Sequence, residues 1–189
     1  MLKIILWVLS SVFVTVFSLG GLNAGDGIWS LIDLSKCAQE LDTVAIKVDI
    51  ERSRINRTHD GISAKLGIEL LIDDSFGILI EVCKYMDGGC KQYQVISDDS
   101  IINLIDKYAK QNVIRAFELA KIDPPEFPVH EGNYEIIDFI MDYCELPTNS
   151  AYGKFEAEVF LVNKESEKVA CIKVVIEFNE LEDDEDLCV

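Results

Sequence analysis

Apolar and polar residues alternate along several stretches of this chain, as they do in antiparallel strands with one buried face. Residues 44–50 show this pattern first, and residues 66–72 repeat it. The turn Asp73-Asp74-Ser75 follows, and residues 76–82 are expected to form the hairpin partner of the preceding strand. Three later strands are predicted at 134–143, 154–163 and 169–179. The pattern as a whole predicts a β-sandwich.

The apolar spacing changes between residues 100 and 122, where apolar positions recur every third or fourth residue. This spacing predicts one amphipathic helix of about 20 residues. Its N-cap is expected within Ser97–Ser100, and Asp123-Pro124-Pro125 should stop it. Either the helix packs on one end or face of the sandwich, or it is a lid whose apolar face covers a cavity mouth or touches lipid. The expected fold class is therefore all-β with one added helix.

Residues 1–24 have the features of a signal peptide: one positive charge at Lys3, a long apolar run, and a small residue before a polar segment. An uncleaved membrane anchor is the alternative, because about 20 apolar residues can span a bilayer. We expect cleavage, followed by one domain from 25 to 179 and a solvated acidic tail from 180 to 189. The expected location is extracellular, after secretion, or the lysosomal lumen.

The net charge of −17 and the isoelectric point near 4.4 limit the partners of this chain. Nucleic-acid binding depends on Lys and Arg that neutralise phosphates, and the sequence shows no basic patch, so this class is excluded. Anionic membranes would also repel the protein at neutral pH. That repulsion fades as carboxylates become protonated, so we expect transient membrane contact only at acidic pH.

Six cysteines follow the signal peptide, as is usual in an oxidising compartment. Cys83 and Cys90 enclose an Asp-Gly-Gly turn, so their thiols are expected to face each other and to bond. The candidate bonds are Cys37 with Cys171, which would tie the two ends of the domain together, Cys83 with Cys90, and Cys144 with Cys188 by elimination. A free Cys188, or one in an intermolecular bond, is an open alternative, because spacing alone does not choose among the connectivities.

No pattern in the sequence is typical of catalysis or of metal binding. The only histidines are His59 and His130, and there is no Cys-x-x-Cys, no Gly-x-Ser-x-Gly and no phosphate-binding loop. We therefore expect no enzyme activity, no catalytic residue, no metal and no cofactor. Asn56 begins an Asn-Arg-Thr sequon, which predicts a glycosylated position on a surface loop.

Several short motifs occur in a fixed order along the chain. They are Cys83 to Cys90, Pro128-x-x-x-Gly132-x-Tyr134, Leu146-Pro147, Gly153-x-Phe155 and Cys171-Ile172-Lys173. As an ordered set they resemble the ganglioside activator protein family, a branch of the ML lipid-recognition domains. That superfamily includes Niemann-Pick type cholesterol carriers and mite group-two allergens, and the resemblance runs from about Cys37 to Phe178. The pattern is also similar to insect members of the domain, some of which resemble chemosensory proteins.

The resemblance implies an immunoglobulin-like antiparallel β-sandwich whose sheets stand apart around an apolar cavity for an acyl chain, a glycolipid or a sterol-like ligand. It also implies bonds between Cys37 and Cys171 and between Cys83 and Cys90. Phe127 stands where the family usually has a cysteine, and the family's extra disulfides before that position are missing. Ganglioside specificity and activation of a hydrolase are therefore not carried over to this chain.

The expected function is secreted lipid binding and lipid transfer by a monomer, with possible presentation of the lipid to an enzyme or receptor. The alternative is a secreted protein-recognition sandwich, chemosensory or immune, that carries no lipid. Inward apolar residues are the candidate walls of the cavity, although in most sandwiches such residues simply form the core. They are Val44, Ile46, Val48, Leu66, Ile68, Leu70, Ile78, Ile80, Ile136, Phe155, Ala157, Val159 and Leu161, with Phe117 of the helix at the mouth.

Overall fold

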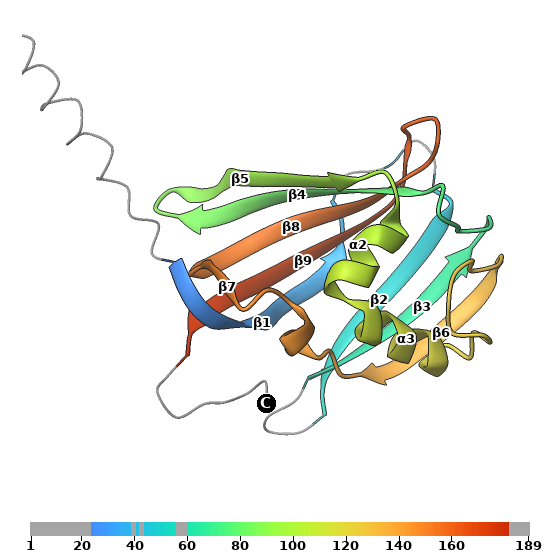
Figure 1. Cartoon of the computed structure of the whole chain (residues 1–189), viewed down its shortest axis with the longest axis horizontal. Helices are drawn as coiled ribbons and strands as arrows, with labels where there is room; N and C mark the ends of the chain where they lie inside the picture. The colour runs from blue at the N-terminus through green and yellow to red at the C-terminus, as the bar shows by residue number, and fades with distance from the viewer. Residues whose placement is uncertain (1–23, 39–40, 42–43, 56–59, 182–189) are drawn as a thin grey trace, which may run out of the picture.

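The computed structural model describes residues 24–38, 41, 44–55 and 60–181, which fold into two antiparallel sheets, two α-helices and one short 3-10 helix. The larger sheet has six strands in the order β5 (Gly89–Asp98), β4 (Gly77–Met86), β8 (Gly153–Val162), β9 (Lys168–Glu180), β1 (Ala24–Lys36) and β7 (Asn149–Ala151). The smaller sheet has the order β2 (Ile46–Arg54), β3 (Asp60–Ile68) and β6 (Gly132–Phe139). The expected all-β sandwich with added helical structure is confirmed (Figure 1).

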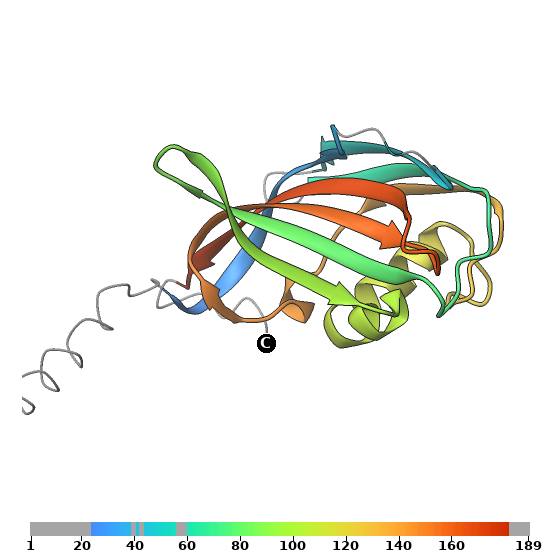
Figure 2. The same cartoon turned by 90° about the horizontal axis from the view of Figure 1, so that it is seen from above.

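The two sheets meet along one edge and are bridged by helices on the other. At the first edge β2 runs beside β1 and β9, and the Ala45 amide donates to the Val169 carbonyl at 3.0 Å. Across the other edge, α2 (Ile101–Tyr108) lies next to β4 and β5, and α3 (Lys110–Leu119) lies next to β6 (Figures 1 and 2). The helices therefore cover one end of the space between the sheets, and the larger sheet extends past them.

Strand β1 precedes Cys37, so the expectation that the first strand covers 44–50 is wrong. β1 lies between β9 and β7 in the larger sheet. The strand was not predicted because the alternation of apolar and polar residues is interrupted at Ile32. A bulge there shifts the register with β9 between Leu31 and Asp33. The following strand, β2, begins only at Ile46.

The predicted hairpin between 66–72 and 76–82 is also wrong. β3 pairs with β2 and β6, whereas β4 belongs to the other sheet and pairs with β5 and β8. The turn at 73–75 does form: the side chain of Asp73 accepts hydrogen bonds from the hydroxyl and the amide of Ser75, and these bonds lower the pKa of Asp73. Turn residues indicate where a chain reverses, but the burial of apolar faces decides which strands pair.

The predicted single helix is divided at Ala109, whose backbone is not helical (φ −153°, ψ 22°). The amides of Gln111 and Asn112 donate to the carboxylate of Glu145 at 2.6 and 2.7 Å, so they do not need partners in the preceding turn. Ser100 is the N-cap of α2, and Asp98 accepts from its amide at 2.9 Å. A helix stop before 123 is confirmed, since α3 ends at Leu119.

The later strands differ in how well the pattern predicted them. β8 and β9 match 154–163 and 169–179 to within one residue at each end. β6 ends at Phe139 instead of 143, because Asp138 adopts a positive φ of 52° and the chain then enters the short helix η1 (Tyr143–Glu145). Strands β5 and β7 were not predicted.

Two disulfides are confirmed. Cys37 bonds to Cys171 on β9, next to the edge where the sheets meet, and Cys83 bonds to Cys90 across the β4–β5 hairpin. The predicted bond to Cys188, the predicted glycosylation at Asn56, residues 1–23 of the predicted signal peptide and most of the acidic tail lie outside the described residues. Within the part that the structure describes, no helix is long and apolar enough to cross a bilayer.

The two disulfides should differ in their contribution to stability. The bond between Cys37 and Cys171 closes a sequence separation of 134 residues, against 7 for Cys83 and Cys90. In the chain-entropy model, closing the longer loop stabilises the fold by about 5 kcal/mol and closing the shorter by about 2.5 kcal/mol. Guanidinium unfolding of the two double Cys→Ala variants should reproduce this order. Equal losses would contradict it.

Candidate functional site

The inner face of the larger sheet is an almost continuous apolar wall. Strand register places side chains of neighbouring strands in rows, because direct partners lie on the same face. Ile78 pairs with Leu161, Ile80 with Val159, and Val82 with Ala157. Seven of the predicted wall residues are half-buried, on the larger sheet or on the elements that face it. They are Ile46, Val48, Leu66, Leu70, Ile80, Ile136 and Val159.

The end of the sandwich beneath the helices is a filled core. Ile68 from the smaller sheet and Leu161 from the larger one are both buried in it, and Leu66, Leu70 and Phe117 pack against it. Phe117 makes an edge contact with Phe127, with ring centroids 5.2 Å apart. The structure thus places Phe117 within the core, not at a cavity mouth. Phe155, Ala157 and Ile78 are also buried.

Val44 does not belong to either wall. It precedes β2, and 45% of its surface is exposed. It lines a pocket of about 420 Å³ with Ile46, Val48 and Ala170 at the edge where the sheets meet, so its contact with a lipid stays a prediction.

A cleft of about 920 Å³ opens where β1, α3 and the segment after β6 come together. We call this opening the cleft. Its volume lies in the range of small-molecule sites. Its apolar lining comes from Ile28, Leu31, Leu119, Phe139, Ile140 and Met141, with Arg115, Glu118, Asp138 and Asp142 among the polar residues at its walls. None of these residues was predicted as part of a site, and Ile28 and Leu31 belong to a strand that was itself not recognised.

A buried asparagine fixes one wall of the cleft. Asn112, only 4% exposed, accepts from the Asp142 amide and donates to the Asp142 carbonyl, both at 2.8 Å. Arg115 donates to the same Asn112 oxygen at 2.6 Å. Glu145 accepts from the first amides of α3. These bonds attach residues 142–145 to the helix, so the cleft has a defined shape at this side.

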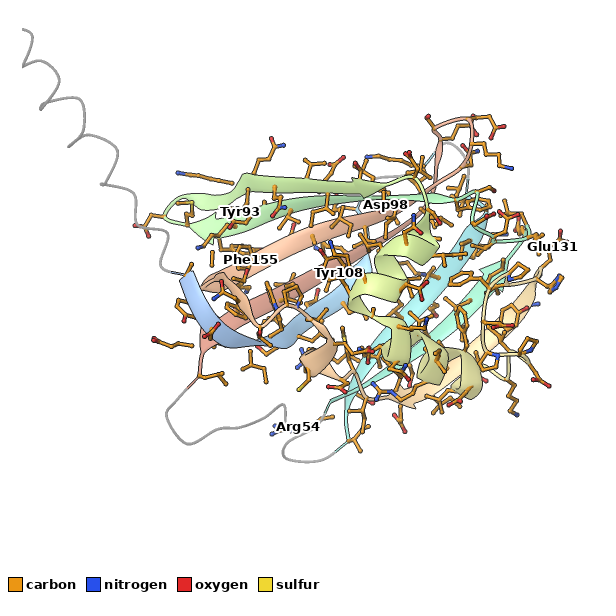
Figure 3. The ribbon with its side chains drawn as sticks, viewed as in Figure 1. Arg54, Tyr93, Asp98, Tyr108, Glu131 and Phe155 are labelled. Atoms are coloured by element: carbon orange, nitrogen blue, oxygen red, sulfur yellow. A yellow bond between two sulfur atoms is a disulfide. The ribbon has the colours of Figure 1, made fainter. Side chains whose placement is uncertain are left out.

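Aromatic side chains gather on the inner face of the larger sheet beyond the helices, and we call this group the aromatic cluster. Trp29 lies 4.7 Å from Phe178 and 5.9 Å from Phe155, centroid to centroid. Tyr93 lies 5.3 Å from Phe155, and Figure 3 shows both on this part of the sheet. Tyr152 stacks on Phe178 at 5.6 Å. Burial raises the pKa of Tyr152, and the nearby carboxylates Glu180 and Asp26 add to the increase.

The outer face of the smaller sheet is polar by contrast. A surface groove of about 580 Å³ there is lined by Lys47, Lys65 and Glu135, among others. Lys65 pairs with Glu135 at 3.6 Å, and both side chains are largely exposed. A groove with satisfied surface ion pairs is an ordinary solvated face. The apolar cleft is therefore the better candidate site.

Neither comparison of this chain with protein-family models and with curated proteins found a match. Among the residues that the structure describes, no group of three or more His, Cys, Asp or Glu side chains is placed to hold a metal ion. The function must accordingly be inferred from the apolar cleft and the walls that lead to it.

Replacing Asn112 with alanine should loosen the cleft wall. The Asp142 amide and carbonyl would lose their partners, which we expect to cost about 2 kcal/mol of unfolding free energy. Faster amide exchange at residues 142–145 should accompany this loss in hydrogen-exchange mass spectrometry. Gln111→Ala is the matched control, because only its backbone amide bonds Glu145, and it should stay within about 0.5 kcal/mol of wild type. Equal effects of the two variants would refute the assigned role.

Proposed function

We propose that this protein is a secreted lipid-binding and lipid-transfer protein that holds an acyl chain, a glycolipid or a sterol-like ligand between its two sheets. The observation that carries the proposal is the cleft of about 920 Å³, whose apolar lining continues into the inner wall of the larger sheet through Leu31. Leu31 pairs directly with Ile176 of that wall. An apolar space of this kind favours hydrocarbon over water.

The energetics support carriage. Moving an acyl chain out of water is favourable by roughly 0.8 kcal/mol per methylene. For an 18-carbon chain this transfer free energy is on the order of 13 kcal/mol. Apolar walls supply shelter of the same kind as a bilayer does. Exchange between the protein and a membrane is then close to energetic balance, which suits a shuttle.

The disulfides support the proposed location. Both bonded pairs are typical of proteins that fold in an oxidising compartment, outside the cytosol. Secretion itself and glycosylation at Asn56 are part of the proposal.

Protein recognition without a lipid is the second candidate function. It is favoured by exposed apolar side chains on the β4–β5 hairpin, which projects at one end of the molecule in Figure 2. Met86 is 57% exposed and Val95 is 49% exposed. Exposed apolar side chains on a projecting element can contribute to an interaction surface.

Protein isolated from its native tissue should carry lipid, and organic extraction followed by mass spectrometry will identify it. Purified protein should also take up a fluorescent fatty acid. Protein that contains no lipid and takes up none would count against carriage and in favour of protein recognition.

An added carboxylate among the apolar residues of the cleft should weaken uptake. Leu119 lines the cleft and is 45% exposed, so Leu119→Glu is compatible with folding. We expect at least about a tenfold weaker affinity for a fluorescent fatty acid, because the new carboxylate desolvates when the chain enters. Val95→Glu provides the control: Val95 is 49% exposed and lies on β5, the edge strand of the larger sheet farthest from the β1–β7 side that borders the cleft. Equal loss in both variants would argue against binding in the cleft.

A further inference from the structure

Two lysines face each other at the end of the apolar wall. Lys84 of β4 and Lys91 of β5 are direct cross-strand partners, and Lys84 is also the partner of Phe155 on β8. Lys84 follows Ile78, Ile80 and Val82 at every second position, so it continues their inward face. Direct partners project from the same side of a sheet, which puts Lys91 beside Lys84 on that face.

Like charges placed directly opposite each other in a sheet are unfavourable unless an anion lies between them. Within the described part of the chain, neither lysine has a carboxylate within ion-pair distance. Lys168, on the same sheet, shows the usual arrangement, with its ammonium 3.0 Å from Glu81. In a chain with a net charge of −17, two adjacent lysines without an acidic partner are unexpected.

The aromatic cluster and the backbone position the Lys84 ammonium. It lies 5.3 Å from the ring centroid of Phe155 and 6.0 Å from that of Tyr93. Gly153 gives the side chain room, because a β-carbon at this position would lie 3.2 Å from Cε of Lys84. The disulfide between Cys83 and Cys90 joins the two strands next to the lysine pair and keeps them in register.

We propose that Lys84 and Lys91 bind the carboxylate of a fatty acid. The inference rests on the proposed lipid carriage and names the class of lipid: a single acyl chain with an ionised acidic headgroup. Lys84, Phe155, Ile176 and Leu31 form one row across four adjacent strands. At the usual strand spacing, Lys84 lies about 14 Å from Leu31, which lines the cleft. The acyl chain runs from the lysine pair toward the cleft beside this row, over the half-buried Ile176 and Trp29.

Calorimetric titration with oleic acid, methyl oleate and oleyl alcohol tests this proposal. At pH 7.5 the acid is ionised and the other two ligands are neutral. Wild-type protein should prefer the acid by about tenfold, as expected for one charge-assisted contact. Lys84→Gln and Lys91→Gln should each reduce this preference, the double variant should abolish it, and Lys84→Arg should retain most of it.

Lys154→Gln is the matched control. Lys154 also lies over an aromatic ring, with its ammonium 4.9 Å from the centroid of Tyr85, but it alternates with Phe155 and so projects from the opposite face of the sheet. This variant should keep the full preference for the acid.

Thermal unfolding supplies a readout that a purely structural role would not produce. Without ligand, Lys91→Gln should have the same melting temperature as wild type or a higher one, because it removes a like-charge pair. With oleic acid it should show a smaller increase than wild type. A preference for the acid that survives in the double variant, or equal binding of acid and ester by wild type, would overturn the carboxylate site and leave lipid carriage standing. Failure of wild type to bind any of the three ligands would refute the proposed function itself.

Discussion

The structure depends on holding two apolar sheet faces together along one edge without letting them close on each other along their whole length. At the edge where β2 meets β1 and β9, a backbone hydrogen bond between Ala45 and Val169 and the disulfide between Cys37 and Cys171 fix the distance between the sheets. At the opposite edge, the helices bridge the two sheets: α2 lies next to β4 and β5, and α3 next to β6. Half-buried apolar residues therefore remain along both walls, where a tighter sandwich would have buried them.

The helices have two structural roles in this arrangement. Their apolar faces complete the core at one end through residues such as Phe117, which removes water from that half of the interior. Their polar contacts, centred on Asn112 and Glu145, hold the segment after β6 in place and shape the cleft. The break at Ala109 links the two roles, because a straight helix could not present the α3 amides to Glu145 in the same way.

The sequence was sufficient to predict the features that depend on residues close together in the chain. The alternation in β8 and β9, the helical spacing after Ser100 and the hairpin around Asp87 and Gly88 were sufficient to predict strands, a helical segment and one disulfide. The bulge at Ile32 concealed β1, and with it one wall of the cleft. The partner of β4 was not predictable from the turn before it, because pairing depends on which distant strand covers the same face. The facing lysines could have been inferred from the two-residue turn, but their position beside the aromatic cluster could not.

The route of the chain between the sheets has a consequence for folding. β1 belongs to the larger sheet, β2 and β3 to the smaller, β4 and β5 to the larger, β6 to the smaller, and β7 to β9 to the larger again. The first described strand pairs with the last, so the larger sheet cannot be completed before β9 is present. Such distant pairings fold slowly and nearly all at once. During synthesis the larger sheet therefore stays incomplete until its final strand emerges, and the apolar faces of the strands already made are exposed to aggregation until then.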